Sequence, residues 1–228
     1  MDKTQLRRHN LVFISQQGKN KILQQIIQLY SGYQLQLIKE ILQGNTDIPS
    51  FIRRNEKEIK DIAVGFVHPQ RLDGNRIRIA CFTDVEDIVA VMTPYEVMQR
   101  NIYAHEARTL CIKEVLKIYE LAEVFDLQIG VFGSAALEMV TGLPYTDENS
   151  DIDLLLKPSG YNRLLQFYRA VSASCKDINL DFEVELPNGY GVKLTEIFME
   201  TQTVLGKSLD NVALLSRKEV MQYLETSC

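Results

Sequence analysis

The sequence predicts an α+β protein with two domains, and the chain of 228 residues is long enough to bury a core in each. Short extended segments separated by turn residues predominate between residues 11 and 92. Strands and helices alternate after residue 127, and one segment alternates acidic and apolar residues as a half-buried strand does. We therefore expect a small α/β N-terminal domain, residues 1–95, and a second domain, residues 96–228, in which helices flank a mixed sheet.

The N-terminal domain is expected to combine a sheet with two helices. Ile and Leu recur at three- and four-residue spacing over residues 21–30 and 34–42, which predicts helices whose apolar faces belong to the core. Apolar segments bounded by polar turns, such as residues 71–75, predict the strands. These strands are expected at residues 11–15, 50–54, 59–67, 76–82 and 88–92.

Capping and turn signals organise the second domain. Residues 93–96 and 216–219 have the capping-box pattern that begins a helix. The Pro-Asn-Gly sequence at residues 187–189 predicts a hairpin turn between strands 178–186 and 190–194. Further helices are expected at residues 105–125, 134–141 and 159–175, and further strands at residues 127–132 and 151–156.

Composition limits the classes of function. The formal net charge is −5, and no Lys/Arg-rich segment with interleaved aromatic residues occurs, so a partner made of nucleic acid is disfavoured. The four cysteines form no CxxC pair, which argues against a zinc cluster. Neither a signal peptide nor an apolar run of the roughly 18 residues that a membrane span needs is present. We therefore expect a cytoplasmic protein with no membrane partner.

One motif joins a strand to a helix through Gly133 and Ser134. Glycine lets the backbone approach a ligand closely, and the first N–H groups of a helix, with their partial positive charge, favour a phosphate. The Ser134 hydroxyl adds a further hydrogen-bond donor. This motif predicts a phosphate-binding turn.

A second motif places two acids on one face of the next strand. Asp151 and Asp153 are two residues apart, so both carboxylates point the same way and are close enough to bind Mg²⁺, which prefers oxygen ligands. A third acid is expected from the neighbouring strand, which carries Asp181, Glu183 and Glu185 on one face. The pattern predicts a magnesium site at which phosphate groups react.

Each motif has an ordinary structural explanation when it stands alone. A Gly-Ser pair often only caps a helix, and an Asp-x-Asp pair often ends a solvated strand. The order of strand, Gly-Ser, helix, Asp-x-Asp strand and acidic strand is far more specific, and it favours a single site.

Basic residues in the N-terminal domain are weaker candidates. Arg53 with Arg54, and Arg76 with Arg78, have the guanidinium groups that suit bidentate phosphate contacts, although solvated strand edges carry arginine equally often. His9 is a further candidate, but a lone histidine is more often structural. We assign no role to the other two histidines, at positions 68 and 105.

The segments around these motifs resemble the malonate decarboxylase holo-acyl-carrier-protein synthase family of phosphoribosyl-dephospho-CoA transferases, which have a nucleotidyltransferase fold. The most specific likeness covers residues 133–145 and 150–155. Asn10 stands where the family's opening has Asp, the chain has no Trp, and residues 19–45 resemble no part of the family. Weaker likenesses lie at residues 8–11, 51–54, 64–66, 76–80, 181–183 and 191–193.

The resemblance implies a defined reaction. An enzyme of this nucleotidyltransferase class would move phosphoribosyl-dephospho-CoA from its triphosphate precursor, triphosphoribosyl-dephospho-CoA, to a serine of an apo acyl carrier protein, and pyrophosphate would leave. Asp151 and Asp153 would hold Mg²⁺, and Asp181 or Glu183 would help to deprotonate the serine. The remaining residues implied in substrate binding are Gly133, Ser134, Arg53, Arg54 and Arg78.

Two other functions remain open from the sequence. A different nucleotidyltransferase would share the metal site and use ATP on a small molecule or a protein. A non-catalytic nucleotide-binding module would keep the fold, although such a protein is expected to lose at least one acid, and here both Asp151 and Asp153 are present.

Overall fold

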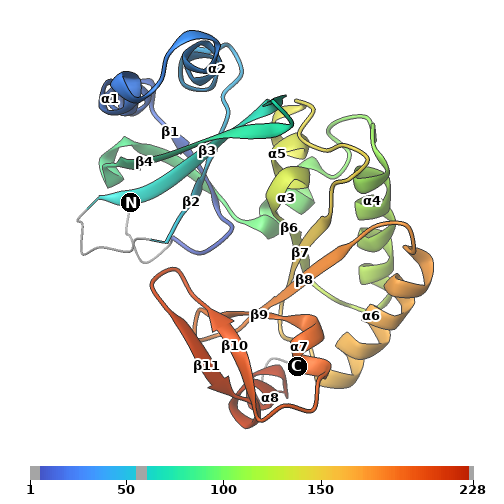
Figure 1. Ribbon diagram of the computed structural model, residues 1–228. Helices are drawn as coiled ribbons and strands as arrows, with labels where there is room; N and C mark the ends of the chain where they lie inside the picture. Colours follow the sequence, from blue (N-terminus) through green and yellow to red (C-terminus); the bar gives the residue numbers. More distant parts are fainter. Residues whose placement is uncertain (1–5, 55–60, 226–228) are drawn as a thin grey trace.

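Two sheets in two lobes organise the computed structural model, which describes residues 6–54 and 61–225 (Figure 1). The α+β class expected from the sequence is confirmed. Strands of the first sheet come from residues 11–92, and those of the second come from residues 129–216. The exact domain limits, 1–95 and 96–228, stay a prediction.

The first sheet is antiparallel with the strand order β4-β3-β2-β1-β5. Two helices, α1 (Gln16–Ile26) and α2 (Gly32–Gln43), pack on one face of it, and a 3₁₀ turn at Ile27–Leu29 separates them (Figure 1). The strands are β1 (Leu11–Ile14), β2 (Ser50–Ile52), β3 (Ile62–Leu72), β4 (Asn75–Thr83) and, after a 3₁₀ turn at Val85–Asp87, β5 (Ile88–Met92).

Alternation along β4 decides which side chains the first sheet presents to the second lobe. Ile77 and Ile79 are buried in the cluster formed with α1 and α2, as the period of two along a strand requires. Arg76 and Arg78 consequently lie on the opposite face of the sheet. That face borders the second lobe (Figure 1), and Arg76 and Arg78 both line a cavity that residues of the second lobe also line.

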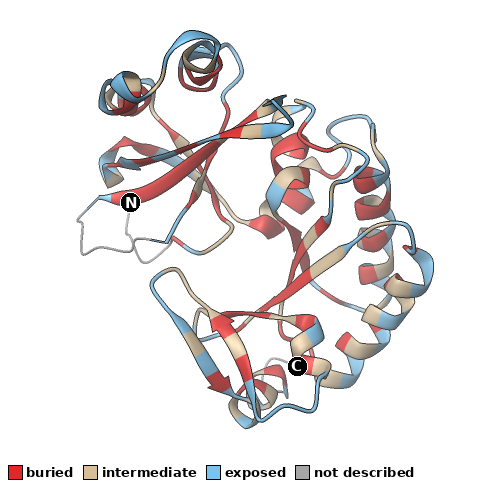
Figure 2. Cartoon of the chain, viewed as in Figure 1, coloured by how far each residue is buried: buried red, intermediate tan, exposed pale blue. Residues whose placement is uncertain are grey.

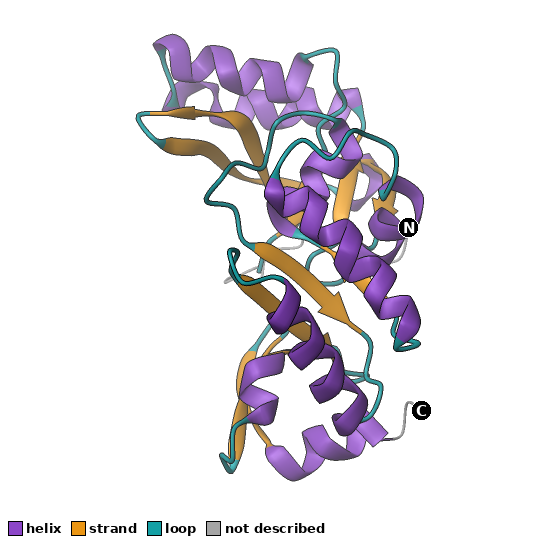
Figure 3. Cartoon of the chain, turned by 90° about the vertical axis from the view of Figure 1, so that its right-hand side faces the viewer, coloured by secondary structure: helices purple, strands orange, loops and turns teal. Residues whose placement is uncertain are grey.

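The second sheet has the order β11-β10-β9-β8-β7-β6, and only the β7–β8 pair is parallel. Helices α4 and α6 cover one face of it, and α3 packs on β6 (Figures 1 and 3). The strands are β6 (Ile129–Val131), β7 (Ile152–Leu156), β8 (Leu180–Glu185), β9 (Gly191–Lys193), β10 (Thr203–Lys207) and β11 (Val212–Ser216). The helices are α3 (Pro94–Asn101), α4 (Leu110–Val124), α5 (Gly133–Thr141), α6 (Tyr161–Ser174), α7 (Leu194–Phe198) and α8 (Arg217–Glu225).

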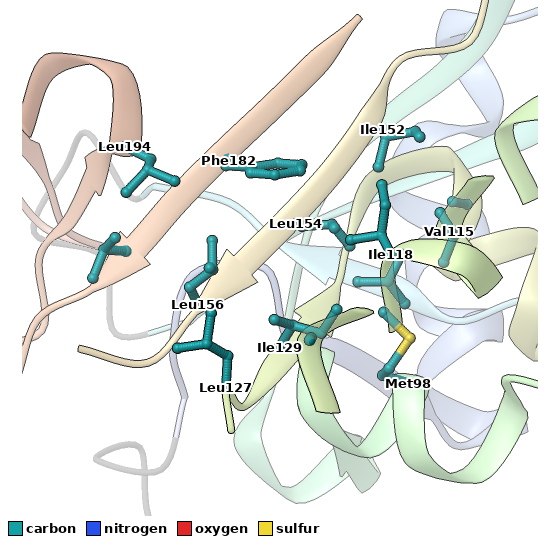
Figure 4. Packing of buried hydrophobic residues seen from close by; sticks show 14 of the residues in the cluster. Met98, Val115, Ile118, Leu127, Ile129, Ile152, Leu154, Leu156, Phe182 and Leu194 are labelled. Carbon is teal, nitrogen blue, oxygen red and sulfur yellow. The ribbon is translucent and has the colours of Figure 1, made fainter. Parts of the chain in front are cut away.

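A large apolar core holds the second lobe together (Figure 4). Ile152, Leu154 and Leu156 of β7 are fully buried between the helices and the neighbouring strands. Burying a side chain of this size stabilises the fold by about 1.5–3 kcal/mol. The strand that carries Asp153 is therefore firmly anchored, and Asp153 itself alternates out of the core.

Several contacts join the lobes. Tyr145 is fully buried, and its hydroxyl donates a hydrogen bond to the carbonyl oxygen of Val67 over 2.9 Å. Arg76 of β4 donates to the Tyr145 carbonyl oxygen across the lobes, and its second hydrogen bond, to the Pro69 carbonyl oxygen at 2.7 Å, stays within the first lobe. Figure 2 shows the buried residues continuing from the strands of one lobe toward those of the other. In the ranges that the structure describes, no helix is long and apolar enough to cross a membrane.

Some expected boundaries are wrong. Helix α1 begins at Gln16 rather than at residue 21, because the Ser15 side chain caps it by accepting from the Gly18 amide at 3.1 Å. Helix α4 begins at Leu110 rather than at residue 105, because Thr109 is its N-cap. The strand expected at residues 59–67 is observed as β3 from Ile62, and residues 59 and 60 lie outside the described ranges.

The prediction also missed elements near the C-terminus. Helix α7, apart from its first residue Leu194, which was expected to end a strand, and the hairpin of β10 and β11 were not expected from the sequence. The hairpin extends the second sheet beyond β9. Lys207, the last residue of β10, accepts a hydrogen bond from the Arg8 guanidinium through its carbonyl oxygen at 3.0 Å, so the missed hairpin contributes to the contact between the lobes.

Candidate active site

The N-terminus of α5 lies open at the end of β6. Phe132 is the N-cap residue, and no side chain caps the helix there. Gly133 has φ of +66°, a left-handed conformation that strongly favours glycine, and the residue is exposed. The first amides of α5 and the Ser134 hydroxyl therefore form the kind of helix N-terminus that binds phosphate.

The two aspartates lie beside this turn. The Phe132 amide donates to the Asp153 carbonyl oxygen at 3.1 Å, so the start of β7 is fixed against the end of β6. A Cβ atom at Gly133 would overlap the Asp153 carboxylate. Asp151 is exposed, and its carboxylate accepts a hydrogen bond from the Asn179 amide group at 3.0 Å. The structure thus brings the two sequence motifs together.

A cavity of about 760 Å³ lies between the lobes at this point. The first sheet provides arginines on one side, and the second lobe provides the helix N-terminus and the aspartates on the other. Arg71 is paired with Asp147 at 2.7 Å, whereas Arg78 is exposed and has no ion pair within the described ranges. The polar lining includes His9, Arg71, Arg76, Arg78, Gly133, Ser134, Asp151 and Asp153.

The three acids of β8 have different partners. Asp181 lies opposite Asp153 in the parallel register and pairs with Lys193 at 3.1 Å. Glu183 is buried and accepts hydrogen bonds from Arg8 and His9, each at 3.0 Å.

Glu185 serves a separate structural network. Its carboxylate binds the Tyr95 hydroxyl at 3.1 Å and the Lys157 ammonium group at 2.6 Å. These contacts hold Glu185 away from the phosphate-binding turn. Asp181 and Glu183 are therefore the acids of β8 that belong with the aspartate pair.

The acids create opposite electrostatic environments. Burial, followed by the nearby carboxylates of Asp181, Asp151 and Glu183, raises the pKa of Asp153 to about 7 against the weaker effect of Lys193. Burial also disfavours ionised Glu183, but hydrogen bonds and favourable electrostatic interactions with His9 and Arg8 outweigh it and lower the pKa of Glu183 to about 2. A bound cation would therefore favour the ionised form of Asp153, whereas the carboxylate of Glu183 is already stabilised by Arg8 and His9.

Two family models match the chain. The phosphoribosyl-dephospho-CoA transferase MdcG C-terminal domain matches residues 99–218, more than half of the chain, and the corresponding N-terminal domain matches residues 7–94. The chain belongs to the phosphoribosyl-dephospho-CoA transferase family. The resemblance that the sequence motifs indicated is therefore confirmed.

Curated relatives agree with the family assignment. A phosphoribosyl-dephospho-CoA transferase from Bradyrhizobium diazoefficiens is 25% identical over 215 residues, which cover 93% of this chain and 91% of the relative. Another from Xanthomonas campestris pv. campestris is 37% identical over 102 residues, which cover 42% of this chain and 46% of the relative. No solved structure matches the chain, so the nucleotidyltransferase-like fold of the second lobe stays a prediction.

Mg²⁺ fits the donor set of the transferase. Within the described ranges, no group of three or more His, Cys, Asp or Glu side chains is placed to hold a metal ion. Magnesium sites that act on phosphates commonly use only one or two carboxylates, and phosphate oxygens and waters supply the other ligands. Asp151 and Asp153 provide such a pair, and a bound cation would relieve the burial cost and the carboxylate repulsion that together raise the pKa of Asp153.

Stability of the metal-free transferase should fall as pH rises. The pKa of Asp153 is about 7 in the folded protein and about 4 in an unfolded chain. Between these values the folded state holds a proton that the unfolded state has lost, so the free energy of unfolding decreases with pH. We expect Tm to decrease from about pH 4 to pH 7 through this group. Differential scanning fluorimetry should show the decrease in wild type and a smaller one in Asp153→Asn. Equal slopes would contradict the assigned environment.

The other residues predicted to bind substrate do not all line the cavity that contains the aspartates. Arg53 lines a neighbouring cavity of about 800 Å³ rather than the one that contains the aspartates, and Arg54 is exposed and lines neither. Arg78 does line the aspartate cavity. Sequence reasoning gave His9 little weight, yet its ring stacks on Phe132 with 3.8 Å between ring centroids. The only sequence signal for His9 is its place in the Arg8–Leu11 segment.

Proposed function

We propose that the transferase moves the phosphoribosyl-dephospho-CoA group from triphosphoribosyl-dephospho-CoA to a serine of an apo acyl carrier protein of the malonate decarboxylase type. The reaction would depend on Mg²⁺ and release pyrophosphate. Family membership supports the transferred group. The observation that carries the chemistry is the meeting of Asp151, Asp153 and the α5 N-terminus in one cavity with Arg78, which has no ion pair among the described residues.

The bonds exchanged follow from the leaving group. The serine oxygen forms a bond to the phosphorus next to the ribose, and the bond from that phosphorus to the pyrophosphate oxygen breaks. The hydroxyl proton passes to a base. Negative charge accumulates on the leaving pyrophosphate, and the α5 amides and Arg78 would stabilise it there. Bound Mg²⁺, held by Asp151 and Asp153, would supply further neutralisation of phosphate charge.

The acids of β8 are less suited to accept the serine proton than an unpaired carboxylate would be. The family resemblance implies Asp181 or Glu183 as the group that helps to deprotonate the serine. A pKa of about 2 makes Glu183 a weak proton acceptor. Asp181 is engaged by Lys193 at 3.1 Å. Both remain close enough to shape the field around Asp153, since both raise its pKa.

Replacement of Arg78 should weaken donor binding without loss of stability. Its side chain is exposed and lines the aspartate cavity, and a guanidinium group that contacts phosphate contributes about 1.5–3 kcal/mol. Arg78→Ala is therefore expected to raise KM for the donor by about tenfold or more. Arg54→Ala is the matched control, because Arg54 is equally exposed but lines neither cavity. Steady-state kinetics that show equal KM values for both variants would contradict the assignment of Arg78.

A pyrophosphate-release assay tests the proposed function. Purified protein is incubated with Mg²⁺, triphosphoribosyl-dephospho-CoA and the apo carrier protein, and a parallel sample receives ATP in place of the donor. We expect release only with the CoA-derived donor. Release from ATP alone would support the alternative nucleotidyltransferase. Ligand binding without any release would support a non-catalytic nucleotide-binding module.

A further inference from the structure

His9 lies between the buried acid Glu183 and the cavity that contains Asp151 and Asp153. The His9 ring lines the cavity that contains Asp151 and Asp153. Its Nε2 atom lies 3.0 Å from a carboxylate oxygen of Glu183, and one face of the ring stacks on Phe132. Because Phe132 immediately precedes Gly133, the ring is held next to the phosphate-binding turn.

The backbone at His9 is set for this placement. His9 has φ of +67°, a left-handed conformation that is uncommon for residues other than glycine and costs about 1–2 kcal/mol. Such conformations persist where the surroundings determine them, and they gather at functional sites. Here the ion pair of the preceding residue, Arg8, with Glu183 and its hydrogen bond to the Lys207 carbonyl group hold the segment in position.

Glu183 fixes which ring nitrogen of His9 can act. With the pKa of Glu183 lowered to about 2, its carboxylate is ionised and can only accept hydrogen bonds. Nε2 of His9 therefore carries the proton and donates it to Glu183. In the neutral ring the lone pair is then on Nδ1, which has no hydrogen-bond partner in the part of the chain that the structure describes.

We propose that His9 is the catalytic base of the transfer and that Glu183 and Arg8 are positioning residues. This inference rests on the proposed function. Nδ1 of His9 takes the proton from the acceptor hydroxyl while the oxygen bonds to phosphorus and pyrophosphate departs. The imidazolium that forms is then stabilised by the ionised Glu183 at Nε2, as a carboxylate stabilises the base in other base–orienter pairs.

The geometry favours His9 over the acids nearby. Both oxygens of Glu183 contact Arg8 or His9, and Lys193 holds Asp181. Asp153 is assigned to the metal, so its lone pairs are committed. The two other histidines do not line this cavity. His68 is buried and pairs with Glu40, and His105 is exposed beside Gly142.

A chemical rescue experiment tests this role. Glycine accepts positive φ and leaves space for free imidazole, so His9→Gly is the first variant. We expect its kcat to fall by about 10²–10⁴-fold, with the Kd for the donor measured by calorimetry little changed. Added imidazole should restore transfer in a saturable manner. His9→Asn keeps a polar side chain that tolerates this backbone and should be equally inactive, but it should not respond to imidazole.

Controls separate a base from a structural residue. His105→Gly, at an exposed histidine, should retain wild-type kcat and show no effect of imidazole. Glu183→Gln should lower kcat more than it raises KM for the carrier, because the ring loses its orientation while the acceptor surface stays. Glu183→Gln also leaves Arg8 without its anionic partner, so circular dichroism is recorded to verify that the variant folds.

The outcomes are distinct. Folded His9→Gly with wild-type kcat, or with a loss that imidazole does not reverse, would overturn the assignment of His9 while wild-type transfer still upheld the proposed function. If wild-type protein released no pyrophosphate, either with the carrier or with water as the acceptor, the proposed function and this inference would be overturned together.

Discussion

Asp153→Asn should abolish transfer and leave the protein folded. The carboxylate lies against Gly133 in the cavity between the lobes, and the charge it would share with Mg²⁺ cannot be replaced by a neutral amide. Loss of metal-ion catalysis amounts to several kcal/mol, so we expect kcat to fall by about 10³-fold or more. Tm of the metal-free variant should not fall, because substitution removes the burial cost of a carboxylate and the repulsion from its neighbours, which together raise the pKa of Asp153.

The comparison needs an acid outside the site. Asp177→Asn removes the same charge from an exposed position just before β8 and should keep wild-type kcat. Initial rates at saturating donor and a titration of Mg²⁺ distinguish the two variants. Turnover of Asp153→Asn that remains dependent on Mg²⁺ at a wild-type rate would remove the basis for the proposed metal site.

Gly133→Ala should impair both folding and transfer. The new Cβ atom would overlap the Asp153 carboxylate, and φ of +66° disfavours alanine. The strained backbone alone costs about 1–2 kcal/mol. Displacement of Asp153 by about 1 Å is expected to reduce kcat by about 10²-fold, because phosphoryl transfer depends on positioning. Urea denaturation and steady-state kinetics measure the two effects on one preparation.

A second glycine separates crowding from backbone strain. Gly32, at the start of α2, has φ of +54° and no heavy atom within 4 Å of the position that a Cβ would take. Gly32→Ala should therefore lose stability comparable to the strain alone and keep wild-type kcat. If Gly133→Ala matched Gly32→Ala in kcat, the close approach of Gly133 to Asp153 would have no catalytic meaning.

Local signals explain which parts of the fold the sequence predicts. The capping box at the start of α3 is present as expected: Thr93 accepts from the Glu96 amide, and Glu96 accepts from the Thr93 amide at 2.9 Å. Ser15 was overlooked because polar residues follow it, although its hydroxyl caps α1. The β10–β11 hairpin was also missed, since its strands are short and Gly206 interrupts the apolar pattern of the first. Its stability comes from pairing with β9 rather than from a strong local pattern.

The site also has residues that local sequence signals predict and residues that only the folded structure brings together. Gly133, Ser134, Asp151 and Asp153 lie within one β-α-β segment, so spacing alone predicts that they meet. His9 and Glu183 are 174 residues apart, and no local pattern predicts their contact. Arg53 and Arg78 looked alike in the sequence, but only Arg78 projects into the cavity with the aspartates. Arg78 alternates with the buried residues Ile77 and Ile79 along β4, whereas Arg53 follows the end of β2, so the difference depends on where each residue lies in the folded sheet.

The intact mass of the apo carrier protein tests the central claim most directly. The carrier is incubated with the transferase and triphosphoribosyl-dephospho-CoA, with and without Mg²⁺, and with Asp153→Asn in place of wild type. We predict a mass gain equal to one phosphoribosyl-dephospho-CoA group, present only with wild-type protein and Mg²⁺. An unchanged carrier mass in the complete reaction, or the same gain with Asp153→Asn, would contradict the account.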